Sequence, residues 1–410
     1  MNRFAANAIG KCHAIAWLVA TASFWNPLVQ PADAIPPEAN NSRETPAASA
    51  SPTARRGATP QDVLQLVSRQ AGRLAFKGVR VQQVIRQDMV LNARARVEYL
   101  SPGAHQFALD APKELEGLNM LVENRQLSIL FPGNGLLFQG DVPEMADEAR
   151  DLVLGTLLLD QAALQRNYRL TVDEELDIVS LYPCYKLTAE PIKGYGVGQP
   201  PGHRFWIAKE NGAILKEERF WGPAEASYFL SHFENFSTSR KPVLKLEEPK
   251  GVNKLKLAKG SPAQITRYAN PDQAKADKKT IFLPKEPPAQ FALRAVEVMS
   301  LYGTDLVFLR YDNGLARVVV TYRTKPNFFL TLLAGAFALA LVDKISALSY
   351  HAPNNYAVVE KGDYLVYAYG DLYVESLKAI ANSVPIPVGP SGNKQVKALN
   401  ELLAHTPPTP

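Results

Sequence analysis

Cysteine is scarce in this chain of 410 residues, which contains only Cys12 and Cys184. No Cys-x-x-Cys or His-x-x-x-His spacing occurs, so the usual patterns of a zinc site are missing. Ser231 and His232 lack a Gly-x-Ser-x-Gly motif, and Gly194–Gly198 is not followed by the lysine of a phosphate-binding loop. We therefore expect no catalytic residues, no metal and no cofactor.

The first residues have the layout of a secretory signal. Arg3 and Lys11 give a weakly positive start, Ala14–Trp25 is a short apolar run, and Ala32-Asp33-Ala34 offers a small-x-small cleavage site. The run is too short to span a bilayer as an anchor. We expect residues 1–34 to be a signal peptide and the mature chain to begin near Ile35, in the periplasm or extracytoplasmic envelope.

Cleavage would leave Cys184 as the single cysteine, so the exported chain would depend on its apolar core rather than on disulfides. Cys184 lies inside a strand pattern, which favours a buried apolar role over a nucleophile. Residues 35–58 are rich in Pro, Ala, Ser and Thr and are expected to be a disordered leader.

The predicted first domain covers residues 59–236. Thr59-Pro60 predicts the start of a helix of about twelve residues. Apolar and polar residues then alternate from Met89 to Tyr99, as in a half-buried antiparallel strand, and further strands follow. A helix over about Glu144–Arg166 is apolar on more than one face and is expected to cover the concave face of the curved sheet.

Apolar side chains at alternating positions of the first strands supply more aligned apolar surface than one sheet face normally needs. We expect them to line a cavity for acyl chains, although helices could also fill the face and leave no cavity. These residues are Met89, Leu91, Val97, Phe107, Leu109, Leu127, Ile129 and Phe131.

Residues 237–289 have weak periodicity and hold twelve Lys and Arg against five Asp and Glu. We expect a basic linker, which either attracts an anionic surface or is a solvated spacer. A second domain is predicted over residues 290–388, with a tight turn at Asp312-Asn313-Gly314 and a last helix capped by Asp371. Residues 389–410 are expected to be a mobile tail.

An apolar insertion over residues 326–349 contains the run Phe328–Val342. As a helix this run would be roughly 22 Å long, short of a hydrocarbon core of about 30 Å. It is either a buried core helix or an exposed helix that docks on a membrane or partner. The docking residues would be Phe328, Phe329, Leu333, Phe337 and Leu339.

Five short motifs stand out along the chain: Tyr182–Leu187, Arg204–Lys216, Leu309–Val319, Gly362–Gly370 and Ile380–Val384. They resemble motifs of the RseB/MucB family of sigma-E regulators, whose first domain is similar to the lipoprotein carrier LolA. In the second motif Ala208 stands where the family usually has aspartate, and the linker and apolar insertion also depart from the family pattern.

The resemblance implies an α+β fold: a LolA-like curved antiparallel half-barrel with helices on its concave face, and a smaller antiparallel α+β domain. It implies a non-enzymatic protein that senses lipid or lipoprotein acyl chains and acts on a membrane-anchored anti-sigma protein. Peripheral membrane contact is compatible with this reading, and nucleic acid is not an expected partner. The alternatives are a periplasmic carrier of lipoprotein or lipid to the outer membrane and, third, an envelope hydrolase or lipid-modifying enzyme.

Overall fold

The computed structural model describes most of the chain between Gly57 and Ile386. The described residues are 57–71, 73–86, 89–101, 103–124, 126–131, 135–141, 160–173, 176–194, 198–222, 226–239, 241–257, 263–277, 279–301, 304–324 and 355–386. The predicted signal peptide, the tail and the run Phe328–Val342 lie outside them, as do most of the leader and of the helix predicted over Glu144–Arg166.

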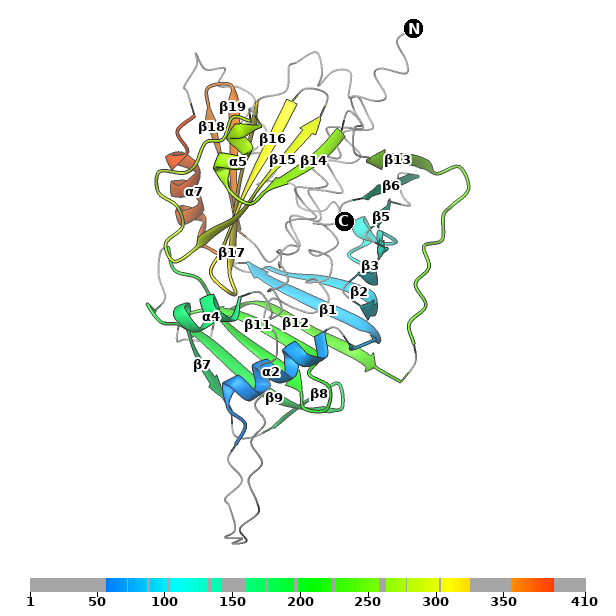
Figure 1. Ribbon diagram of the computed structural model, residues 1–410. Coiled ribbons are helices and arrows are strands. Elements are labelled where there is room, and N and C mark those ends of the chain that lie inside the picture. The colour runs from blue at the N-terminus through cyan, green and yellow to red at the C-terminus, as the bar shows by residue number, and fades with distance from the viewer. Residues whose placement is uncertain are drawn as a thin grey trace, which may run out of the picture.

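The described chain is a strand-rich α+β protein with two open sheets, which are mainly antiparallel (Figure 1). The larger sheet has 13 described strands in the order β13-β6-β5-β4-β3-β2-β1-β12-β11-β10-β9-β7, with β8 also paired to β9. Its strands are β1 (Phe76–Arg86), β2 (Met89–Ser101), β3 (Ala104–Ala111), β4 (Asn119–Glu123), β5 (Gln126–Phe131), β6 (Leu136–Asp141), β7 (Tyr168–Val172), β8 (Asp177–Val179), β9 (Tyr182–Pro191), β10 (Gly202–Ala208), β11 (Ile214–Trp221), β12 (Ala226–Ser237) and β13 (Asn253–Leu257).

Two helices lie on one face of this sheet. Helix α2 (Pro60–Ala71) begins where the sequence predicts, with Thr59 and Asp62 bonded reciprocally as a capping box. Helix α4 (Gln161–Asn167) is capped by Asp160, whose side chain accepts from Ala163 N. Both helices share a core with apolar side chains of β9 and β10, so helices do cover this face, as predicted. A short 3-10 helix, η1 (Lys113–Leu115), follows β3.

The second sheet has 6 described strands in the order β14-β15-β16-β17-β19-β18. They are β14 (Ala263–Tyr268), β15 (Ala292–Leu301), β16 (Thr304–Asp312), β17 (Arg317–Thr324), β18 (Asn355–Lys361) and β19 (Tyr364–Gly370). Helix α7 (Val374–Ser383) packs its apolar face on this sheet, and helix α5 (Pro271–Ala276) precedes β15 (Figure 1).

The range predicted as a linker, residues 237–289, contains strands β13 and β14 and helix α5, which corrects the prediction for these parts of it. Within it β13 pairs in parallel with β6 of the first sheet, and β14 pairs with β15 of the second. Lys254 and Lys256 both belong to β13, so part of the lysine excess of this range lies on an edge strand.

Two local predictions are also corrected. The sequence pattern predicts one strand over Val179–Glu190. The structure has two strands there, β8 and β9, because Ser180 and Leu181 both take positive φ between them. Asp371 was expected to cap the last helix, but the N-cap position of α7 is Tyr373, which makes no side-chain cap. The Asp371 carboxylate is instead bound to Arg219 and to the backbone N–H of Arg317.

Candidate functional site

The candidate site begins with the apolar face of strands β2 to β5. Val97 pairs with Phe107, Phe107 with Met120, and Met120 with Ile129, so these side chains form one row across four strands. A cross-strand row of this kind points to one side of the sheet.

The structure brings the predicted acyl-binding residues together on neighbouring strands. Six of them are less than 9% exposed, while Leu91 is half-buried and nothing is described of the Met89 side chain. The six are Val97, Phe107, Leu109, Leu127, Ile129 and Phe131. We call these six and Leu91 the concave apolar face.

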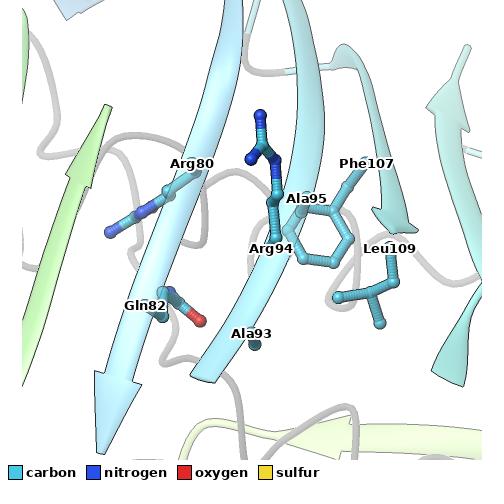
Figure 2. Close-up of a pocket in the computed structure, with 7 residues that line it drawn as sticks. All are labelled: Arg80, Gln82, Ala93, Arg94, Ala95, Phe107 and Leu109. Carbon is cyan, nitrogen blue, oxygen red and sulfur yellow. The ribbon is translucent and has the colours of Figure 1, made fainter. Parts of the chain in front are cut away.

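A narrow space lies where this face meets β1. It is bordered by Arg80, Gln82, Ala93, Arg94, Ala95, Phe107 and Leu109 (Figure 2). The side chains close this space so tightly that the volume open to a water molecule is about 0 Å3, whereas a typical ligand pocket measures roughly 300–1,000 Å3. An acyl chain would therefore need the bordering side chains to move.

Arg80 links this space to a group of buried charges. Its side chain points from β1 toward the neighbouring strand, away from Phe107 and Leu109 (Figure 2). There Arg80 Nε donates to Ser231 Oγ at 2.6 Å, and Nη2 lies 3.8 Å from Glu217 Oε2. Sequence reasoning missed Arg80 because a charged residue at an inward position hides the alternation that marks a strand.

The charges continue across β11 into the second sheet. Arg219 Nε donates to Glu217 Oε1 at 2.9 Å, and Arg219 Nη1 donates to Asp371 Oδ1 at 2.7 Å. The side chains of all three residues are 7% exposed or less. We call Arg80, Glu217, Arg219 and Asp371 the buried ion chain.

Burial and mutual attraction set the protonation of these groups. Desolvation acts to raise the pKa of Glu217, but Arg219 and His203 outweigh it and lower the pKa to about 2. Desolvation lowers the pKa of Arg80 to about 10, which Glu217 only partly offsets. For Arg219 the carboxylates of Asp371 and Glu217 outweigh desolvation and raise the pKa. Arg80, Glu217 and Arg219 are therefore charged at neutral pH.

The second sheet also inserts a hairpin into the core of the first sheet. Asn167 Nδ2 donates to the carbonyl oxygen of Asn313 at 2.8 Å, and Leu315 lies fully buried in the core built around α2, α4, β9 and β10. The sequence predicted this turn correctly from Asp312-Asn313-Gly314, but nothing in a turn motif indicates that it is buried. The two sheets thus share part of one core.

The outer face of the first sheet carries an open groove next to β8, bordered among others by Asp177, Trp206 and Lys216. Trp206 Nε1 donates to Asp177 Oδ2 at 2.6 Å, and the ammonium of Lys216 lies 3.9 Å from the centroid of the Trp206 ring. Arg204, on the same strand as Trp206, pairs with Glu218 at 3.1 Å. Phe205 and Ile207 of the same strand lie in the core on the opposite face, so the motif Arg204–Lys216 contributes to both faces of the sheet.

Among the described residues no three His, Cys, Asp or Glu side chains gather as metal ligands would. Cys184 is buried, as predicted, and burial raises the pKa of its thiol to about 11. No described helix is both long and apolar enough to cross a membrane.

Solved structures resemble this chain, whereas protein-family models and curated sequences do not. No protein-family model matches the chain, and no curated protein sequence matches it. MucB in complex with MucA(peri) matches at 15% identity and a TM-score of 0.45, over 80% of this chain and 99% of MucB. The chain is similar in structure to MucB.

Two further structures extend the comparison. The MucA/MucB complex of Pseudomonas aeruginosa matches at 13% identity and a TM-score of 0.45, over 80% of this chain and 99% of that one. The LolA superfamily protein NE2245 from Nitrosomonas europaea matches at 13% identity and a TM-score of 0.23, over 45% of this chain and 96% of its own. Both the MucB-like and the LolA-like resemblances stated from the motifs are thus found among the structural neighbours.

Proposed function

We propose that this chain is an extracytoplasmic binding protein with a regulatory role, whose ligand is the acyl chain of a lipid or lipoprotein. The observation that carries the proposal is the concave apolar face, where side chains from β2, β3 and β5 line up on one side of the sheet. A sheet face of this extent favours an apolar ligand, because burying apolar area contributes about 25 cal/mol per Å2.

A regulatory role is favoured over a carrier role by the second sheet. Arg219 and Asp371 join the two sheets through a buried ion pair, so that binding on one sheet has a physical route to the other. The partner we propose, on the motif resemblance to RseB/MucB regulators, is a membrane-anchored anti-sigma protein. Peripheral contact with the membrane through Phe328, Phe329, Leu333, Phe337 and Leu339 belongs to the same proposal.

The test of ligand binding compares two neighbouring residues on β2. Leu91 is half-buried and pairs with Val84, which is buried, whereas Asn92 is exposed. We expect Leu91→Arg to weaken displacement of a fluorescent fatty acid and Asn92→Arg to leave it unchanged, because only the first places a charge on the concave apolar face. Native mass spectrometry of protein extracted from envelopes under mild conditions would show the bound lipid.

Two results would count against the proposal. One is a purified protein that carries no lipid and binds no fatty acid. The other is a folded Leu91→Arg protein, verified by circular dichroism, that binds fatty acid as well as the Asn92→Arg protein does.

A further inference from the structure

The buried ion chain has one end at the narrow space between the concave apolar face and β1, which we call the concave space, and the other end at the second sheet. Arg80 borders the space beside Ala95 and Phe107 (Figure 2). Asp371 directly follows β19, and its Oδ2 accepts from the backbone N–H of Arg317, the first residue of β17, at 3.0 Å. Asp371 N in turn donates to the carbonyl oxygen of Arg317 at 2.8 Å. A displacement of Asp371 therefore moves two strands of the second sheet.

Each inner member of the chain is shared between two partners. Glu217 lies between Arg80 and Arg219, and Arg219 lies between Glu217 and Asp371. A buried carboxylate that loses one cation must be compensated by another, because an unpaired charge in a protein interior is strongly unfavourable. Moving Arg80 away from Glu217 thus draws Arg219 toward Glu217 and away from Asp371, whose carboxylate keeps the hydrogen bond from the backbone N–H of Arg317.

We propose that the buried ion chain couples ligand occupancy of the concave apolar face to the joint between the two sheets. By the joint we mean the Arg219–Asp371 contact and the buried hairpin around Asn313. An acyl chain that enters beside Ala95 and Phe107 displaces Arg80, and the Arg219–Asp371 contact loosens in response. The inference rests on the proposed acyl ligand, but it adds the direction of the response, since ligand loosens the joint.

Other contacts define how the joint can move. The hairpin around Asn313 stays seated in the core of the first domain through Leu315. The indole of Trp221 stacks on Tyr373 with ring centroids 4.2 Å apart, next to the ion pair. When Arg219 separates from Asp371, the second sheet therefore rotates relative to the first about the buried hairpin around Asn313. The stacking of Trp221 on Tyr373 shifts or breaks in this rotation.

If ligand binding and opening of the joint are linked, a change that opens the joint must also change the affinity for ligand. Asp371 does not border the concave space, so Asp371→Asn leaves the ligand's surroundings intact. The change removes the carboxylate that pairs with Arg219 and so weakens the contact between the two sheets. If ligand favours the loosened state, a protein already loosened binds it more tightly. We expect Asp371→Asn to bind fatty acid about fivefold or more tightly than the unaltered chain, within the usual range of coupling between sites.

The joint itself can be followed by the distance between two spin labels. Glu210, between β10 and β11, and Asp363, between β18 and β19, are exposed and lie on different sheets. The experiment uses the full chain with Cys12→Ser, Glu210→Cys and Asp363→Cys. Cys184 is buried and its pKa is raised to about 11, so it is not expected to react with the label.

We expect one distance population in the unliganded protein and a second one when oleate is added. Asp371→Asn should show the second population without oleate. The matched control is Asp305→Asn, which removes a carboxylate from the same sheet, partly exposed and paired with Lys279 at 3.1 Å. It should leave both the distances and the affinity unchanged. If Asp371→Asn does not fold, Arg219→Lys replaces it, since lysine keeps the charge but not the planar geometry.

The outcomes separate this inference from the proposed function. Oleate that binds without changing the distances, or an Asp371→Asn protein with altered distances and unaltered affinity, overturns the coupling and leaves acyl binding intact. An unaltered chain that binds no oleate overturns acyl binding and the coupling together.

Discussion

Arg219 of β11 lies 2.7 Å from Asp371 of the second sheet, and neither side chain is more than 7% exposed. Removing one partner of such a pair leaves a buried charge without compensation, which costs about 3–5 kcal/mol. We expect Asp371→Asn and Arg219→Met each to lower the free energy of unfolding by that amount, measured by urea denaturation.

The double variant provides the control for this prediction. Because the pair is broken only once, Arg219→Met/Asp371→Asn should lose less than the two single changes added together. Asp305→Asn, which breaks a partly exposed pair, should lose about 0–1 kcal/mol. Strict additivity of the two single variants would show that the residues do not interact.

Stability should fall with acid because of His203 and Glu217. Burial lowers the pKa of His203, with Glu217 acting in the opposite direction from 3.8 Å. The neutral form is favoured in the folded state, so its contribution is present above a pH of about 6.5 and is lost as the pH falls. The pKa of Glu217 is lowered to about 2, so its contribution is present above about 4.5 and is lost as the pH falls toward 2.

Urea unfolding at a series of pH values would show both stages. His203→Phe should remove the upper stage, because a phenyl ring fits between Tyr168 and Phe205, whose rings flank the imidazole. His232→Gln should change it less, since His232 is only half-buried. A His203→Phe protein with the same pH profile as the unaltered chain would contradict the assignment.

Strands could be predicted from the sequence where apolar residues alternate with polar ones. They were missed where positions that face the core hold charged or polar residues. Strand β2 was predicted because Ala93, Ala95 and Val97 alternate with polar residues. Strand β1 was missed because its inward positions include Arg80 and Gln82, which are buried although polar. The ion chain depends on contacts between residues far apart in sequence, such as Arg219 and Asp371, and periodicity carries no information about those.

Gly314 is expected to be essential to the joint. It has a φ of 104°, and a Cβ at this position would lie 2.4 Å from the backbone nitrogen of Leu164. Gly314→Ala must therefore push the hairpin away from α4 and should lower the free energy of unfolding by roughly 3 kcal/mol or more.

Gly251 is a matched control for this change. It also has a positive φ, 76°, but nothing lies within 4 Å of a Cβ built there. Gly251→Ala should lose only the backbone strain of about 1–2 kcal/mol. Thermal or urea unfolding of both variants compares the two, and equal losses would mean that the contact with α4 does not matter.

Cleavage of the signal peptide can be tested although residues 1–34 lie outside the described part of the chain. The charged start, short apolar run and Ala32-Asp33-Ala34 predict cleavage before Ile35. Protein recovered from the envelope fraction should begin at Ile35 on N-terminal sequencing. An intact Met1 in the cytosol would contradict it, and Ala34→Arg should slow processing because the cleavage site needs small residues.

The run Phe328–Val342 also lies outside the described residues, and two variants decide its role. If it is a core helix, Leu333→Asp with Leu339→Asp buries two charges and should destabilise the second domain by several kcal/mol. If it docks on a membrane, the double variant should stay folded and lose liposome binding, because apolar area drives insertion. We propose docking, aided by Arg323 and Lys325, which attract anionic lipid by about 1 kcal/mol each.

The salt dependence of liposome binding distinguishes docking that involves charges from a purely apolar contact. Binding of the unaltered chain to liposomes with anionic lipid should fall as salt is added, since screening acts on the charges and not on the apolar area. Thr331→Asp with Gly335→Asp is a matched control, because it adds the same two charges to the run without removing a large apolar side chain. Thermal melts beside liposome flotation complete the comparison, and a double variant of Leu333 and Leu339 that fails to fold would assign the run to the core.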